Sequence, residues 1–138
     1  MILRVVTDVR VVRFVEERLK TTFIPPFTAM GVEIDGEIAG GIVFNMFEGA
    51  DCHMTVASDR RPWPKGFLAD VGDYLFEQLK RERVTVMTEQ PRVVSIARRL
   101  GGQVEGVMRH HYGHGRDATV VGILRDEWKY RRRGHELS

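Results

Sequence analysis

A basic turn that ends in a glycine is the segment of this sequence best suited to bind an anion. Arg60, Arg61 and Lys65 follow a predicted strand, and Gly66 directly precedes a predicted helix that opens at Phe67. The first N–H groups of a helix lack partners within it and lie at the positive end of its dipole, so they attract phosphate. Arginine and lysine add charge-assisted hydrogen bonds to the same anion. The segment predicts a phosphate site, and a solvated loop whose cations balance acidic neighbours is the alternative.

Two side chains on predicted strands could remove a proton from a substrate. His53 has an ordinary pKa of about 6.5, which suits a general base at neutral pH. Glu33 could do the same through a water molecule. Each also has a simpler interpretation, as a histidine packed on a sheet face or as a solvated strand carboxylate. Ser95 and Tyr112 are hydroxyl groups that could donate a proton.

Three histidines near the end of the chain raise the question of a metal site. His110 and His111 are adjacent on a predicted strand and therefore point to opposite faces, with His114 in the turn that follows. No H-E-x-x-H motif accompanies them. Cys52 is the 1 cysteine of the chain, so a disulfide framework and a Cys-cluster zinc site are excluded. We expect no metal, and a buried thiol at Cys52.

Composition points to one domain without a broad electrostatic field. The chain has 138 residues, and 21 basic against 19 acidic side chains leave a net charge of +2. This length suits one domain, and this charge supplies no field for nucleic acid or a membrane surface. We expect residues 1–128 to form the domain and residues 129–138 a basic, frayed tail. The basic run Lys129–Arg133 is best interpreted as solvated, because no nucleic-acid-binding motif accompanies it.

The location of the protein follows from two expected absences. No apolar run approaches the roughly 18 residues that a membrane helix needs. The first residues enter a strand-like pattern without the charged start and apolar stretch of a signal peptide. We therefore expect a cytoplasmic protein that does not bind a membrane.

Hydrophobic periodicity predicts the element order β-α-β-β-β-α-β-α-β-β. Asp8 is placed to cap the first helix, and Asp35–Gly36 predicts a two-residue type I′ hairpin. Gly40 and Gly41 indicate a bulge or a close approach of another backbone. The central strand-helix-strand unit requires a parallel pair, so the fold is an α/β mixed sheet. The predicted strands span 2–6, 32–34, 37–47, 52–57, 84–88, 104–112 and 119–124, and the helices span 9–20, 67–81 and 91–100.

This order, and segments at matching places within it, resemble the GNAT acyltransferase superfamily from about Leu3 to Trp128. Arg61–Gly66 is similar to that family's R/Q-x-x-G-x-G/A pyrophosphate loop. Gln90–Gly102 is similar to its N-x-x-A-x-x-x-Y-x-x-x-G-F segment, and Val104–Arg109 to the E-G-x-x-R continuation. The late Arg125–Trp128 also looks like the family's common chain end.

The resemblance implies transfer of an acetyl or other acyl group from coenzyme A to an amine, by direct attack on the thioester. Acetyl-CoA would lie between splayed strands at 52–57 and 84–88, with no metal. A base would remove the amine proton, with His53 as the first candidate and Glu33 as the second. The acceptor would be a small-molecule or peptide amine, and two copies could pair at the edge of the C-terminal hairpin.

The implied contacts with acetyl-CoA fall into three groups. The pyrophosphate would be held by the basic turn and the start of the helix, the pantetheine and acyl carbonyl by the backbone of a strand, and the far wall by the third helix. These residues are, in that order, Arg60, Arg61, Trp63, Lys65, Gly66 and Phe67, then Met54, Thr55, Val56 and Ala57, then Ser95 and Ile96.

Four positions depart from the family pattern. Pro64 stands where the loop has its first glycine and Pro62 where another is frequent, and a proline has no N–H to donate. The loss of one charge-assisted hydrogen bond corresponds to about 1.5–3 kcal/mol, a tenfold to hundredfold loss of affinity. Ala97 occupies the position of the tyrosine acid, and Gly102 that of an aromatic residue. The alternative function is therefore a binding or regulatory module without activity.

Overall fold

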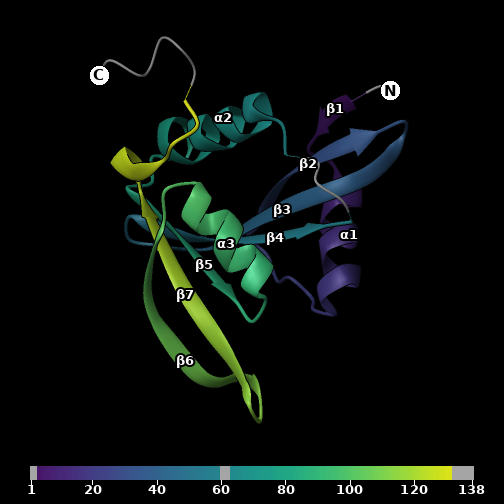
Figure 1. The fold of residues 1–138 in the computed structure, drawn as a ribbon. Coiled ribbons are helices and arrows are strands. Elements are labelled where there is room, and N and C mark those ends of the chain that lie inside the picture. Colours follow the sequence, from purple (N-terminus) through teal and green to yellow (C-terminus); the bar gives the residue numbers. More distant parts are fainter. Residues whose placement is uncertain (1–2, 60–62, 132–138) are drawn as a thin grey trace.

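A computed structural model describes residues 3–59 and 63–131 (Figure 1). The elements follow in the predicted order. A π-helical turn, Tyr74–Gln78, continues α2, and a 3-10 turn, Arg125–Glu127, follows β7. The strands are β1 (Leu3–Val6), β2 (Thr28–Ile34), β3 (Glu37–Glu48), β4 (Asp51–Ser58), β5 (Arg83–Thr88), β6 (Gln103–Gly113) and β7 (Arg116–Leu124), and the helices are α1 (Val9–Leu19), α2 (Lys65–Asp73) and α3 (Pro91–Arg99).

The strands form one seven-stranded mixed sheet in the order β1-β2-β3-β4-β5-β7-β6. All neighbours are antiparallel except β4 and β5, the predicted parallel pair. At the start of this pair, Glu82 and Arg83 donate backbone hydrogen bonds to the carbonyl of Ala50. The ladder between them then has a single register position, His53 opposite Thr85. Beyond it the two strands separate, and the sheet opens at its centre.

Helix α1 covers one face of the sheet, and α2 and α3 cover the other (Figure 1). The apolar side of α1 packs on β3 and β4 with Val11 and Val15 fully buried. A Cβ atom at Gly41 would lie 2.9 Å from Cγ1 of Val11, so this helix can approach the sheet only because position 41 is glycine. The close approach predicted from the glycines of this strand is confirmed.

Local signals place two boundaries of the fold as predicted. Asp8 accepts a hydrogen bond from the Arg10 N–H at 2.9 Å and caps α1. Asp35 and Gly36 have φ angles of 51° and 88°, which are the left-handed values that a type I′ turn requires. Strand β2 starts four residues earlier than predicted, because Thr28 pairs with Phe44 of the long β3.

The C-terminal end of the described chain packs against the domain. Trp128 is buried, and its indole N–H donates to the carbonyl oxygen of Leu68. Lys129 donates its backbone N–H to Leu100, and Tyr130 packs on the core. Lys129 and Tyr130, the first residues of the expected tail, therefore contact the domain, and residues 132–138 lie outside the described part of the chain. No helix in that part is long and apolar enough to span a membrane.

Candidate active site

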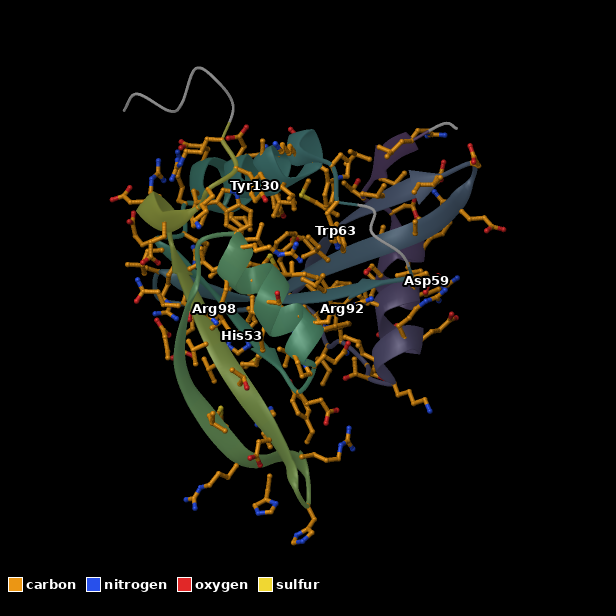
Figure 2. All side chains as sticks on the ribbon, in the orientation of Figure 1. His53, Asp59, Trp63, Arg92, Arg98 and Tyr130 are labelled. Atoms are coloured by element: carbon orange, nitrogen blue, oxygen red, sulfur yellow. The ribbon has the colours of Figure 1, made fainter. Side chains whose placement is uncertain are left out.

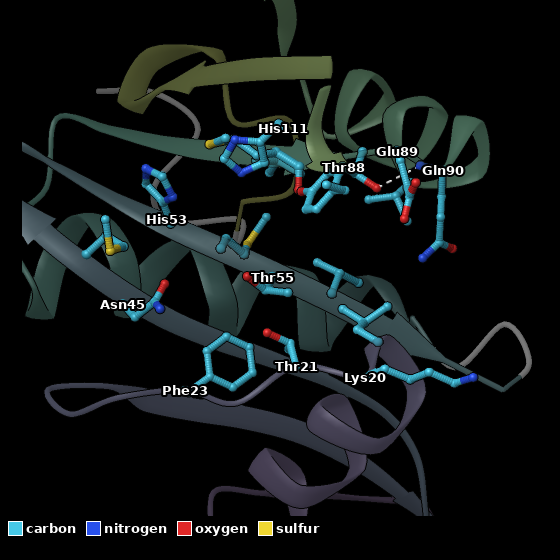
Figure 3. A pocket seen from close by; sticks show the side chains of 18 of the residues that line it. Lys20, Thr21, Phe23, Asn45, His53, Thr55, Thr88, Glu89, Gln90 and His111 are labelled. Carbon is cyan, nitrogen blue, oxygen red and sulfur yellow. Dashed lines mark hydrogen bonds between the residues drawn. The ribbon is translucent and has the colours of Figure 1, made fainter. Parts of the chain in front are cut away.

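A cavity of about 480 Å³ opens where β4 and β5 separate (Figure 3). Its inner walls are residues 53–56 of β4 and 86–88 of β5. The segment after α1 and the β6–β7 hairpin complete its sides. The expected opening between these two strands is therefore present as a lined cavity, and Met54, Thr55 and Val56 line it as expected.

His53 lies at the closed end of this cavity (Figure 3). Its side chain and that of Thr55 face the cavity, while Cys52 and Met54, which alternate with them along β4, pack in the core. Burial lowers the pKa of His53, and the charges of Arg83 and His111 lower it further, although Asp51 acts in the opposite direction. The imidazole is therefore neutral at pH 7 and can accept a proton.

Charged and polar side chains hold the two strands together beside His53. The Thr85 hydroxyl donates to the Asp51 carboxylate, with oxygen distances of 2.8 and 2.9 Å. Arg83 donates to the Glu105 carboxylate at 2.6 and 3.2 Å, and its Nη2 also lies 3.2 Å from the Thr85 hydroxyl. These contacts hold the strands together at the closed end of the opening. The Asp51 carboxylate at this end is two positions before His53 in the chain.

A phenol reaches the opening from β6. Tyr112 donates its hydroxyl hydrogen to the carbonyl oxygen of Met87 at 3.0 Å, two residues beyond the position where β5 last pairs with β4. It can do so because β6 changes register between Met108 and Gly113, with His110 in the left-handed region at a φ of 58°. Burial raises the pKa of Tyr112, and the phenol keeps its proton at neutral pH.

An ion pair stands at the mouth of the cavity. Arg116 of β7 donates to both carboxylate oxygens of Glu89, from Nη2 at 2.5 Å and from Nε at 3.0 Å. The hydrogen bonds from Arg116 lower the pKa of Glu89, so this carboxylate stays charged. Sequence analysis gave neither residue a role, because the two are 27 positions apart and Arg116 was expected in a turn.

The start of α2 offers backbone donors near the end of β4. Pro64 is the cap residue, and no side chain in residues 3–59 and 63–131 caps the helix, so within this part of the chain the N–H groups of Lys65, Gly66 and Phe67 are available. A Cβ at Gly66 would meet nothing within 4 Å, which leaves room above these groups. Pro64 therefore removes only the donor of the cap residue itself. Arg60, Arg61 and Pro62 lie outside the described residues.

Trp63 lies beside this helix start, and Arg92 lies beside the end of β4 (Figure 2). The Trp63 ring stacks on Phe67 with centroids 5.6 Å apart, and its buried Nε1 has no hydrogen-bond partner among the described residues. Arg92, at the start of α3, donates from Nη2 to the carbonyl and hydroxyl oxygens of Ser58 at 3.2 and 3.3 Å. This guanidinium places a cation at the end of β4. Sequence analysis missed Arg92, because no local pattern links α3 to Ser58.

Other expected site residues lie elsewhere. Glu33 is 5% exposed, and its carboxylate accepts a hydrogen bond from Arg10 at 2.7 Å, away from the cavity. The expectation of a solvated carboxylate there is wrong, because β2 holds this side chain beside Arg10. Ala57 packs under α1, Ser95 is exposed on α3, and Ile96 packs against the core, so none of the three lines the cavity.

Two further expectations concern Cys52 and a possible metal site. Cys52 is buried as predicted, and burial raises its pKa to about 12. Within residues 3–59 and 63–131, no three His, Cys, Asp or Glu side chains are grouped so that they could hold a metal ion. His110 and His114 stack on each other, with centroids 4.9 Å apart, at the tip of the β6–β7 hairpin.

Comparison with known proteins identifies the fold. No protein-family model matches the sequence, and no curated protein matches it. The spermidine/spermine N-acetyltransferase SpeG of Vibrio cholerae is similar in structure, with a TM-score of 0.69 and 14% identity over 90% of this chain and 93% of that one. A dodecameric structure of spermidine N-acetyltransferase from Vibrio cholerae has a TM-score of 0.68 and 13% identity over 90% and 94%. The ribosomal-protein-S5-alanine acetyltransferase of Vibrio fischeri has a TM-score of 0.62 and 14% identity over 75% and 64%.

The chain has the GNAT fold that these acetyltransferases share. The predicted resemblance and the predicted α/β mixed sheet are both confirmed. At identities of 13–14% the likeness is one of fold. The activity of this chain must therefore be argued from its own side chains.

Proposed function

We propose that the protein is a cytoplasmic enzyme that transfers an acetyl group from acetyl-CoA to an amine. One observation carries the proposal: the cavity lies where parallel β4 and β5 part, with a neutral histidine at its closed end, and α2, the next helix after β4 in the chain, starts without a side-chain cap among the described residues. The imidazole of His53 can accept a proton, and the helix N–H groups can hold an anion. Acetyl-CoA needs both, because it carries a pyrophosphate and a thioester.

The residues near the end of β4 fit the pyrophosphate. The free N–H groups of Lys65, Gly66 and Phe67 form the backbone part of the seat, and Lys65 and Arg92 supply positive charge. Trp63 has a buried Nε1 donor that no described residue uses. Arg60 and Arg61 are proposed as further contacts from the sequence alone. Acetyl-CoA supplies the activated acyl group, and these residues hold and orient it.

The transfer itself requires one proton to be removed and one to be supplied. His53 takes a proton from the amine as its nitrogen forms a bond to the acyl carbon. As the carbon–sulfur bond breaks, Tyr112 donates its proton to the leaving sulfur. The backbone of β4 between Met54 and Val56 would hold the acyl oxygen, because within the described chain no strand pairs with it on the β5 side.

Tyr112 is proposed as the acid because the usual position cannot supply one. Ala97 lies where the resembled family has a tyrosine, and it is 2% exposed in the core. The Tyr112 hydroxyl instead enters the opening from the opposite side, on β6. Glu33 is not proposed as a second base, because it is bonded to Arg10 outside the cavity.

A binding or regulatory module is the alternative function. The missing tyrosine at Ala97 and the missing donor at Pro64 favour it. Thermal unfolding with and without acetyl-CoA separates the two proposals. An enzyme should gain roughly 2.7 kcal/mol of stability when acetyl-CoA is present at about a hundred times its Kd. No change at millimolar acetyl-CoA favours the alternative.

Two copies of the chain are proposed to pair through β6. This strand is the sheet edge, and its Val107 side chain is 57% exposed. An antiparallel pairing centred on Val107 places Glu105 of one copy opposite Arg109 of the other, so the edge complements itself in charge. Sedimentation should give a dimer for the native protein and a monomer for Val107→Asp. A native monomer contradicts the pairing.

A further inference from the structure

The walls of the cavity carry one carboxylate, and that carboxylate is already paired. Glu89 is the only acidic side chain among the described residues that line the cavity. Both of its oxygens accept hydrogen bonds from Arg116, and Lys20 adds a second cation to the lining. The described walls therefore offer no unpaired carboxylate to an additional ammonium group on an acceptor.

The lining also carries a group of apolar side chains beside its polar ones. Leu19 and Phe23 lie on the side of α1, and Met87 and Tyr112 lie across from them. Met46 of β3 also lines the cavity and is 61% exposed, although methionine side chains usually pack in the core. An apolar ligand that covers these side chains would remove their surface from water, which is favourable.

We infer that the acceptor is a monoamine on an apolar body and that a polyamine is a poor acceptor. This inference rests on the proposed transfer to an amine and names its substrate class. Contact of the body with Phe23 and Met46 supplies affinity, and His53 removes a proton from the one amine. Every additional ammonium group would lose water without gaining a carboxylate partner, which is unfavourable. The chain therefore differs from the spermidine acetyltransferases that share its fold.

Calorimetric titration of amines into the full-length protein tests the inference. The amines are 2-phenylethylamine and spermidine, each added with coenzyme A present so that binding is measured without turnover. We expect 2-phenylethylamine to bind at least about tenfold more tightly than spermidine. A smaller ratio, or no binding of 2-phenylethylamine, overturns the inference. A short peptide that begins with phenylalanine forms a third arm, and its tighter binding would identify the apolar body as a peptide N-terminus.

Substitutions in the cavity separate charge from apolar contact. Arg116→Gln frees the Glu89 carboxylate, so spermidine should bind about threefold to tenfold more tightly while 2-phenylethylamine changes less than about twofold. Met46→Ser should weaken 2-phenylethylamine about threefold and leave spermidine unchanged. Arg99→Gln is the matched control, because Arg99 is an exposed arginine outside the cavity, and it should alter neither amine.

Separate titrations test the acceptor class and the proposed function. Titration of acetyl-CoA alone tests the transferase, and the ratio of the two amines tests the acceptor class. If acetyl-CoA binds and spermidine binds as tightly as 2-phenylethylamine, only the acceptor class is overturned. If Arg116→Gln does not strengthen spermidine binding, the charge argument fails and the inference fails with it.

Discussion

The two ends of the β4–β5 pair differ in construction. At the N-terminal ends, backbone hydrogen bonds to Ala50 and the contact between Thr85 and Asp51 join the strands. At the C-terminal ends the strands part around a cavity lined by polar and apolar side chains, and helix α2 starts without a side-chain cap within the described chain. Polar side chains therefore join the two strands at the closed end, whereas at the open end the strands no longer pair. We propose that the closed end stabilises the fold and that the open end binds ligand, with His53 where the two meet.

The largest effect should come from the residue at the junction of the two ends. His53→Ala should lower kcat by about a hundredfold or more, because it removes the proposed base. The free energy of unfolding of the free protein should stay within about 1 kcal/mol of the native value, because His53 is only partly buried. Release of the coenzyme A thiol measures the rate with an amine that binds. Native turnover in this variant would remove His53 from the mechanism.

Substitution of the proposed acid should have the next largest effect. Tyr112→Phe removes the proton and keeps the ring, so kcat should fall about tenfold to a hundredfold while the Kd for acetyl-CoA is unchanged. Ser95→Ala is the control, because Ser95 is exposed outside the cavity and should leave kcat as it is. Equal rates in native protein and Tyr112→Phe would mean that another group protonates the sulfur.

Arginines on one helix can test the open end. Arg92→Ala should weaken acetyl-CoA binding about tenfold, because it removes a cation near the end of β4. Arg98→Ala removes the same charge from the exposed end of α3 and should change the Kd less than about twofold (Figure 2). Calorimetric titration of acetyl-CoA compares the variants. Equal losses of acetyl-CoA affinity in the two variants would show that the Arg92 cation makes no specific contact with acetyl-CoA.

A substitution at the closed end should lower the free energy of unfolding. Thr85→Val keeps the shape of a buried side chain but removes the hydroxyl that donates to Asp51, so the free energy of unfolding should fall by about 1 kcal/mol. Affinity for acetyl-CoA should not change. Urea unfolding and an acetyl-CoA titration measure the two quantities. Unaltered stability combined with weaker binding would reverse the roles assigned to the two ends.

The smallest effect is expected in the pH dependence. Because burial lowers the pKa of His53, the acid limb of the pH–rate profile should lie below about pH 6.5. Asp51 raises that pKa, so Asp51→Asn should move the limb to still lower pH. The rate at neutral pH should therefore change little. A limb that moves to higher pH would show that Asp51 does not act on the imidazole.

Local chemistry made much of the fold predictable. Asp35–Gly36 specifies its turn because both residues tolerate positive φ, and Asp8 caps α1 through a bond that spans two residues. The opening between β4 and β5 and the cavity face of His53 follow from strand alternation together with the family resemblance.

Long-range contacts made the rest of the site unpredictable. Arg92 acts near β4 through a contact over 34 positions, and Glu33 meets Arg10 over 23 positions. Tyr112 enters the opening only because His110 takes a left-handed conformation within β6. None of these depends on a local pattern, so sequence alone could not rank Arg92 or Tyr112 above Glu33.

Amide chemical shifts during an acetyl-CoA titration test the central proposal most directly. In the uniformly 15N-labelled full chain, the largest changes should fall on two separate segments, Met54–Val56 in β4 and Lys65–Phe67 at the start of α2. The amides of β1 and β2 should barely move, since α1 and β3 separate them from the cavity. Changes confined to other segments, or no changes at saturating acetyl-CoA, would contradict the assignment of this opening as an acyl-donor site.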